Sequence, residues 1–159
     1  MQIKPSSKAI GFAAAMLFAT ASVQAQPAAD NFTFQSSSNP ATVVGSDGTG
    51  PNPYTGTFLT GTIQTAFESG ETRNGTFSCV SMTQPPNGKL FDMHMLCDGT
   101  DKQGTYSATF GCTIINAATE NFSCVGGLYG KSGAYAGRGG TATNHSLGGK
   151  ASGTGQWYK

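Results

Sequence analysis

Glycine is concentrated near the C-terminal end of the chain. Eleven of the 23 glycines lie between positions 126 and 155, in the run GGLYGKSGAYAGRGGTATNHSLGGKASGTG. Because each glycine inside a helix costs about 0.5–1 kcal/mol relative to alanine, this stretch is not helical. Tyr129 and Tyr135 interrupt the run and Trp157 and Tyr158 follow it, which is not typical of a flexible linker. Spaced glycines with aromatics predict strands that curve sharply or approach one another closely.

Hydrophobic residues elsewhere repeat with a period of two, and no segment shows a sustained helical period. The pattern predicts strands over 54–63, 76–82, 90–97, 105–115, 122–129, 139–145 and 150–158. Turn residues separate them, including the Asn87-Gly88 pair that favours tight hairpins. The arrangement is all-β and antiparallel, either a barrel or a β-sandwich. Residues 26–53 are polar and form an expected N-terminal arm with at most one short strand, which leaves 54–159 as the β domain.

The alternation places one set of side chains on a common apolar face. All four cysteines belong to this set, which is a consequence of parity along the strands. The set consists of Phe77, Cys79, Phe91, Met93, Met95, Cys97, Tyr106, Ala108, Phe110, Cys112, Phe122, Cys124 and Leu128. Thr76, Ser78, Asp92 and His94 are among the intervening positions and lie on the opposite face.

Four cysteines in an exported chain favour two disulfides over a metal site. Their spacings are 18, 15 and 12 residues, without the close C-x-x-C pair of a zinc site. A turn at Asn87-Gly88 predicts a bridge between Cys79 and Cys97, and a turn near Ala118 predicts one between Cys112 and Cys124. A register shift of two residues keeps the faces and allows other partners.

The N-terminal 25 residues have the pattern of a signal peptide. Lys4 and Lys8 precede the apolar stretch 9–21, and Val23-Gln24-Ala25 forms an A-x-A-like cleavage site that is typical of bacterial signals. We therefore expect secretion or a periplasmic location, with no membrane span in the mature chain. The chain has no basic patch, which argues against nucleic acid as a partner. No metal or cofactor is expected, and the pattern leaves the oligomeric state open.

The segment from Gly127 to Thr143 contains a G-x-y-G-x-[YF]-x-G-x-x-G pattern, with aromatics between glycines ahead of a strand. It resembles the allene oxide cyclase-like and dirigent-like β-barrels, mainly over residues 124–158. The resemblance implies an up-and-down, calycin-like barrel of eight antiparallel strands with a central cavity. Plant members of these families guide cyclisation or coupling of reactive apolar intermediates. Their cavity residues have no one-to-one match in this chain.

Two groups of residues are candidates for a site. Asp92 and His94 lie two apart on one strand face, where a carboxylate could orient a general base; a solvent-facing polar pair is the alternative interpretation. Apolar side chains that could line a ligand pocket, or else pack in the core, are Met93, Tyr106, Tyr129, Tyr135 and Trp157. No G-x-S-x-G nucleophile elbow or phosphate-binding loop is present.

Three functions fit these patterns. The first is a barrel that binds one small apolar or amphipathic ligand. The second is a cyclase-like or isomerase-like enzyme in the same cavity, using Asp92 and His94. The third is a surface or structural protein whose barrel is filled by its own side chains. A cavity lined by apolar groups without ionisable side chains would favour the first.

Overall fold

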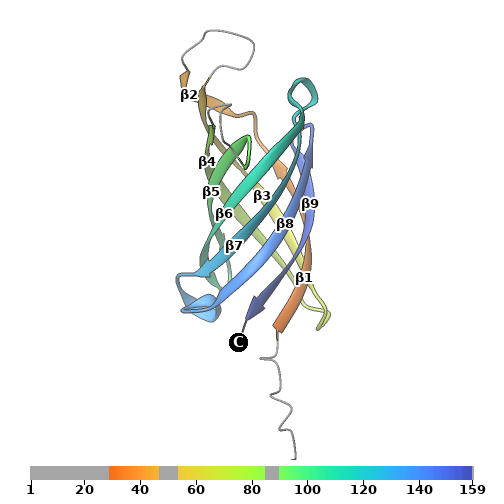
Figure 1. Cartoon of the computed structure of the whole chain (residues 1–159). Helices are drawn as coiled ribbons and strands as arrows, with labels where there is room; N and C mark the ends of the chain where they lie inside the picture. Colours follow the sequence, from red (N-terminus) through yellow and green to blue (C-terminus); the bar gives the residue numbers. More distant parts are fainter. Residues whose placement is uncertain (1–28, 47–53, 85–89, 159) are drawn as a thin grey trace, which may run out of the picture.

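The computed structural model describes residues 29–46, 54–84 and 90–158, and these form an antiparallel β-barrel. The expected signal peptide and the Asn87-Gly88 turn lie outside the described residues. Figure 1 shows the strands tilted around the barrel axis. The elements are β1 (Ala29–Ser38), β2 (Thr42–Ser46), β3 (Thr55–Phe67), β4 (Thr72–Thr83), β5 (Met93–Asp101), β6 (Gly104–Asn116), η1 (Ala117–Thr119), β7 (Asn121–Gly130), η2 (Gly133–Tyr135), β8 (Gly139–Leu147) and β9 (Lys150–Tyr158).

Strand β1 closes the barrel, because it pairs with β9 on one side and with β3 on the other. Phe34, for example, is opposite both Gly153 of β9 and Thr65 of β3. Eight strands thus form the closed barrel, and β2 is an extra strand that pairs with β3 beyond the end of β1. The segment 26–53 therefore contains a full barrel strand instead of a loose arm, and the barrel begins at Ala29. Barrel closure pairs the first strand with the last strand. A pattern of neighbouring residues in the sequence does not indicate a pairing between segments so far apart.

The inward face of the strands forms the core, as the alternation predicts. Its buried hydrophobic residues are Phe32, Phe34, Phe67, Cys79, Met95, Cys97, Ala108, Phe110, Cys112, Cys124, Leu128, Tyr135, Ala142 and Trp157. Both predicted disulfides are confirmed. Cys79 is directly opposite Cys97, and Cys112 is directly opposite Cys124, with Cα–Cα distances of 4.0 Å in each pair.

Inward glycines of one strand lie beneath aromatic rings of the next. The directly opposite pairs are Phe32 with Gly155, Phe34 with Gly153, Phe77 with Gly61, Tyr106 with Gly99, and Phe110 with Gly126. A Cβ atom at each of these glycines would meet the partner's ring. The glycines leave room for large rings to lie flat against the barrel wall. The C-terminal glycine run is therefore partly explained by the rings that it accommodates.

One predicted inward side chain, Phe91, lies on the outer surface. Its ring covers Gly111 and makes an edge contact with His94, which is exposed. Regular pairing in β5 begins only at Met93, so the alternation does not extend back to Phe91.

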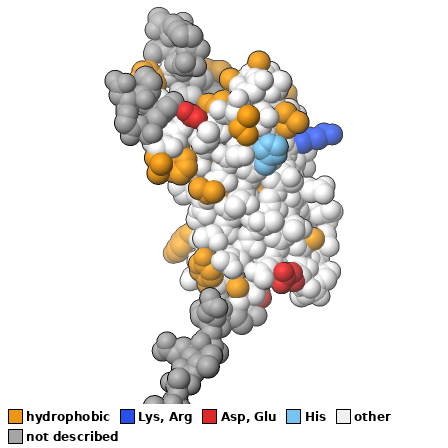
Figure 2. Space-filling model, turned by 45° about the vertical axis from the view of Figure 1, so that its right-hand side comes forward, with side chains coloured by type: hydrophobic (Ala, Val, Ile, Leu, Met, Phe, Trp, Pro, Cys, Tyr) orange, Lys and Arg blue, Asp and Glu red, His pale blue; other side chains and the backbone are white. Residues whose placement is uncertain are grey.

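The face shown in Figure 2 is covered mostly by uncharged polar side chains and backbone, with hydrophobic groups gathered toward the upper end. Within the described ranges, no helix has the length and apolar character of a membrane span.

Candidate functional site

The interior of the barrel contains a cavity of about 120 Å³. Strands β1 and β3 to β9 all contribute to its wall, together with Tyr135 from η2. The apolar part of the wall includes Phe32, Phe34, Leu59, Ile63, Phe67, Phe77, Met95, Tyr106, Phe110, Phe122, Leu128, Tyr135 and Trp157. Among the described residues that line the cavity, none is Asp, Glu, His, Lys or Arg. The cavity is therefore lined mostly by apolar groups, with no charged side chain among its described lining residues.

The connection between β7 and β8 closes one end of the barrel. It carries Tyr135, which is 2% exposed and points into the interior. Backbone hydrogen bonds hold this connection against the β5–β6 hairpin: Lys131 N donates to Thr105 O at 2.9 Å, and Ala134 N donates to Gln103 O at 2.8 Å. The η2 connection is thus a fixed cap at this end of the barrel.

Gly133 lets the cap lie this close to the hairpin. Its φ is +61°, a conformation that favours glycine, and a Cβ atom there would overlap the backbone oxygen of Gln103. On the opposite side, Arg138 makes an ion pair with Asp30 of β1 at 2.6 Å, and its Nε donates to the backbone oxygen of Tyr158 at 3.2 Å. The cap is therefore attached to strands on both sides of the barrel opening.

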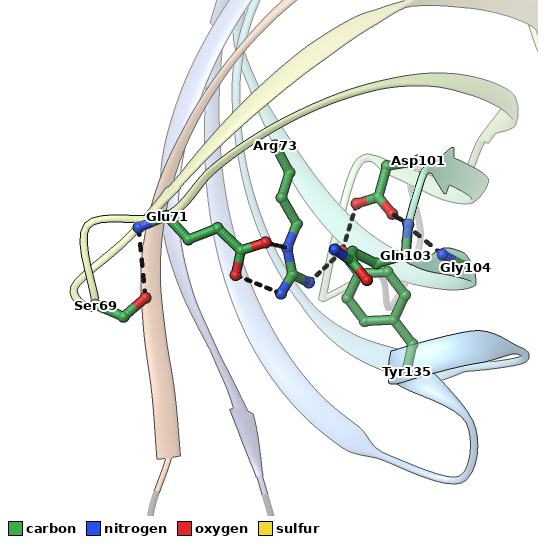
Figure 3. A network of polar contacts seen from close by, with 7 residues as sticks. All are labelled: Ser69, Glu71, Arg73, Asp101, Gln103, Gly104 and Tyr135. Carbon is green, nitrogen blue, oxygen red and sulfur yellow. Dashed lines mark hydrogen bonds and ion pairs between the residues drawn. The ribbon is translucent and has the colours of Figure 1, made fainter.

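A polar network of residues that do not line the cavity holds the Tyr135 hydroxyl in place (Figure 3). The Tyr135 hydroxyl donates to Asp101 Oδ2 at 2.5 Å and accepts from Arg73 Nη1 at 3.0 Å. Arg73 also donates to both carboxylate oxygens of Glu71, at 2.7 and 2.8 Å. The other oxygen of Asp101 accepts from the backbone nitrogens of Gln103 and Gly104. We call Glu71, Arg73, Asp101 and Tyr135 the latch.

The hydrogen bonds and burial of the latch favour the ordinary charge states of Glu71, Arg73 and Tyr135. The hydrogen bonds from Arg73 hold the pKa of Glu71 below its usual value, and those to Glu71 raise the pKa of Arg73. Burial, followed by the hydrogen bond to Asp101, raises the pKa of the Tyr135 hydroxyl. Tyr135 is therefore protonated near neutral pH, when it donates to Asp101. Such a saturated network stabilises a structure and holds no group free for acid–base chemistry.

Three aromatic rings form the floor of the cavity next to the latch. Their centroids lie 5.2 Å apart for Tyr106 and Tyr135, 5.0 Å for Tyr135 and Trp157, and 5.8 Å for Tyr106 and Trp157. The Arg73 guanidinium lies 4.3 Å above the Phe67 ring. Burial, with a smaller effect of the Asp101 charge, raises the pKa of Tyr106 to about 12. These contacts make the floor aromatic and rigid.

Polar side chains line the opposite part of the cavity, toward the β8–β9 hairpin. They are Ser36 and Ser38 of β1 and Asn144 and Ser146 of β8. Ser38 Oγ donates to the backbone oxygen of Gly149 in the hairpin at 3.1 Å. Asn144 Oδ1 is buried, and none of the described residues donates a hydrogen bond to it. The cavity thus has an aromatic floor and a polar wall.

The structure places three of the five predicted pocket residues, Tyr106, Tyr135 and Trp157, in the cavity wall. Met93 packs against the core but does not line the cavity. Tyr129 is 62% exposed and faces outward. Strand parity explains why Trp157 of β9 faces the interior and Tyr129 of β7 the surface, whereas Tyr135 enters the interior from the η2 turn.

Asp92 and His94, the predicted catalytic pair, lie outside the cavity. Asp92 Oδ2 accepts a hydrogen bond from the backbone nitrogen of Ile114 at 2.8 Å, so the carboxylate pairs with the β6 backbone. His94 is exposed and touches the Phe91 ring. Neither lines the cavity. In the described ranges, no cluster of three or more His, Cys, Asp or Glu side chains is arranged to hold a metal ion.

Sequence reasoning missed Asn144 and the latch residues Glu71, Arg73 and Asp101, although strand parity gives a signal for Asn144, Arg73 and Asp101. Arg73 has the parity of Cys79 in β4, and Asp101 has the parity of Cys97 in β5, so both belong to the inward face. Both occupy the same end of the barrel, where an inward charge needs a partner. Asn144 has the parity of the buried Ala142 and Ser146 in β8. Extending the inward face to the strand ends would have identified these residues.

No family model, curated protein or solved structure matches the chain. The resemblance to allene oxide cyclase-like and dirigent-like barrels therefore stays a prediction.

Proposed function

We propose that this protein binds one small, mostly apolar molecule inside its barrel. The observation that carries the proposal is the cavity of about 120 Å³, which has an aromatic floor, a polar wall and no Asp, Glu, His, Lys or Arg among its described lining residues. An apolar cavity of about 150 Å³ binds benzene in another protein, whereas drug-sized ligands need roughly 300–1,000 Å³. The expected ligand therefore has about the size of a single ring.

The cavity argues against a barrel that is completely filled by its own side chains. The cavity also gives little support to the cyclase or isomerase alternative, because neither Asp92 nor His94 lines the cavity. The phenols of Tyr106 and Tyr135 have raised pKa values, so both are protonated near neutral pH and are poor general bases. Binding is therefore the function that this geometry supports best.

The two disulfides indicate an oxidising compartment, outside the cell or in the periplasm. We propose export through the N-terminal signal, with a mature chain that starts at Gln26. N-terminal sequencing of the protein from its native host tests this. A mature protein that retains Lys4 and Lys8 would contradict it.

Native mass spectrometry of the exported protein tests the binding function directly, because a bound ligand adds a discrete mass. Trp157 provides a second readout, since it is the only tryptophan and lies in the cavity wall at 3% exposure. We expect a single-ring hydrocarbon such as toluene to change its fluorescence saturably.

Two neighbouring positions of β6 offer a matched control for this titration. Ala108 lines the cavity, whereas Thr109 faces outward and is exposed. Ala108→Leu should fill the cavity and abolish the saturable response, while Thr109→Leu should retain it. Ala142→Val is a milder filling variant should Ala108→Leu fail to fold. A response that persists in a folded filling variant, or is absent from the wild type, would overturn the proposal.

A further inference from the structure

Asn144 is a polar side chain placed in the apolar interior of the barrel. It lies on the inward face of β8, opposite Cys124 of β7 and next along the face from the buried Ala142 and Ser146. Its Oδ1 is buried, and no donor from the described residues reaches it. Leaving a buried acceptor unpaired costs about 1–3 kcal/mol, and the large majority of buried side-chain polar atoms in proteins are paired. A hydrogen-bond donor from another molecule would remove this cost.

Asn144 has polar neighbours on the side of the β8–β9 hairpin. By strand register, Ser146 is opposite Ala151 of β9, and Ala151 is opposite Ser36 of β1, so these residues form a row next to Asn144. The ring floor of Tyr106, Tyr135 and Trp157 lies at the capped end of the cavity. A molecule in the cavity therefore meets polar groups toward the β8–β9 hairpin and aromatic groups toward the cap.

The charge of the cavity wall restricts the molecule further. A buried ion requires a partner of opposite charge, and the described lining contains no Asp, Glu, His, Lys or Arg. Arg73 and Asp101 are the charged residues nearest to the floor in the latch, and each already forms a hydrogen bond with the Tyr135 hydroxyl. The molecule that fits is neutral and carries its polarity in a group that donates a hydrogen bond.

We propose that the ligand is a neutral, single-ring-sized molecule with a hydroxyl group that donates to Asn144 Oδ1, while its apolar part lies on the aromatic floor. A hydroxyl suits this position because it both donates and accepts, so it also complements the neighbouring serine hydroxyls. This inference rests on the proposed binding function and assigns Asn144 as the residue that selects the ligand's polar group.

Phenol and toluene test the assignment, because they have nearly the same size and differ in a hydroxyl against a methyl group. Dissociation constants of both are measured by calorimetry for the wild type and for Asn144→Leu. The phenol-to-toluene affinity ratio is expected to be about tenfold higher in the wild type, the effect of one hydrogen bond to a buried acceptor. Comparing the phenol-to-toluene affinity ratio between the wild type and the variant cancels the difference in hydration between free phenol and free toluene.

Two further variants make the result interpretable. Asn144→Ala also removes the amide, but it creates space where Asn144→Leu fills it. If the amide selects phenol, both Asn144 variants should lower the phenol-to-toluene affinity ratio. Asn144→Ala also serves as the test variant should Asn144→Leu fail to fold. Thr143→Leu changes the exposed neighbour on the other face of β8 and should leave the ratio unchanged.

The outcomes separate this inference from the function on which it rests. Saturable binding of both probes with the same ratio in the wild type and in the Asn144 variants would overturn the inference and leave the binding function standing. It would mean that the amide is satisfied by water in the complex. Absence of binding by both probes would instead contradict the binding function itself.

Discussion

The Phe34 ring lies against Gly153, its direct neighbour across β1 and β9, so closely that a Cβ atom at Gly153 would be 2.7 Å from Phe34 Cε1. The pair sits on the seam where the first and last strands close the barrel. A Cβ atom at Gly153 would also overlap the backbone oxygen of Thr143 in β8. We therefore predict that Gly153→Ala lowers the free energy of unfolding by about 1–3 kcal/mol, because both the ring and the strand pairing must shift. Thermal unfolding followed by circular dichroism measures the loss.

Gly127 provides the control for this substitution. It lies on the outward face of β7, and a Cβ atom there would meet only the backbone oxygen of Gly140, at 3.9 Å. Gly127→Ala should be neutral or slightly stabilising, because alanine reduces the freedom of the unfolded chain. If both variants unfold like the wild type, neither the Phe34 ring nor the neighbouring backbone of β8 requires glycine at position 153.

The latch should contribute to stability through the Tyr135 hydroxyl. Tyr135→Phe keeps the ring but leaves Asp101 Oδ2 and Arg73 Nη1 without this partner. We expect a loss of about 1–3 kcal/mol in the free energy of unfolding, measured by urea denaturation. Tyr129→Phe is the matched control, since Tyr129 is 62% exposed, and should change stability by less than about 0.5 kcal/mol. Equal effects of the two substitutions would argue against the latch.

Period-two alternation explains why so much of the barrel wall could be predicted from the sequence. Parity alone placed the four cysteines inward, and a short hairpin makes Cys112 and Cys124 direct neighbours. Each of these inferences depends on residues close together in the chain. Phe91 shows the limit, because irregular backbone before Met93 breaks the alternation.

Features that depend on distant segments could not be predicted in the same way. The pairing of β1 with β9 joins residues about 120 positions apart, such as Phe34 and Gly153, and leaves no local pattern. The candidate site has the same property. Asn144 is recognisable as inward by parity, but its missing donor and the cavity beside it arise only when all eight barrel strands come together.

Removing one disulfide tests how far the closed barrel supports itself. The Cys112–Cys124 bridge spans 12 residues and lies in the core without lining the cavity, whereas Cys79 and Cys97 line it. Replacing Cys112 and Cys124 together with Ala should cost about 3 kcal/mol in the chain-entropy model while ligand affinity is retained. Urea denaturation and the toluene titration measure the two effects separately. An unchanged free energy of unfolding would show that strand pairing alone orders this hairpin.

The partly buried Tyr106 phenol should make the barrel sensitive to alkaline pH. Burial raises its pKa from the ordinary value of 10.0 to about 12, so the folded state retains the proton after the unfolded state has lost it. Below pH 10 both states are protonated and stability does not depend on this group. Stability is lost as the pH rises from about 10 through about 12, by about 3 kcal/mol in total.

Tyr106→Phe identifies the origin of this loss, because it keeps the ring of the cavity floor and removes the titrating proton. Urea denaturation at intervals from pH 8 to 12, with reversibility checked by return to pH 8, should show a shallower fall in the variant. Part of the loss of stability at alkaline pH should remain in the variant. Burial also raises the pKa of Tyr135, so the Tyr135 phenol contributes a loss in the same direction. A Tyr106→Phe curve parallel to that of the wild type would mean that the Tyr106 phenol ionises as readily in the folded barrel as in the unfolded chain.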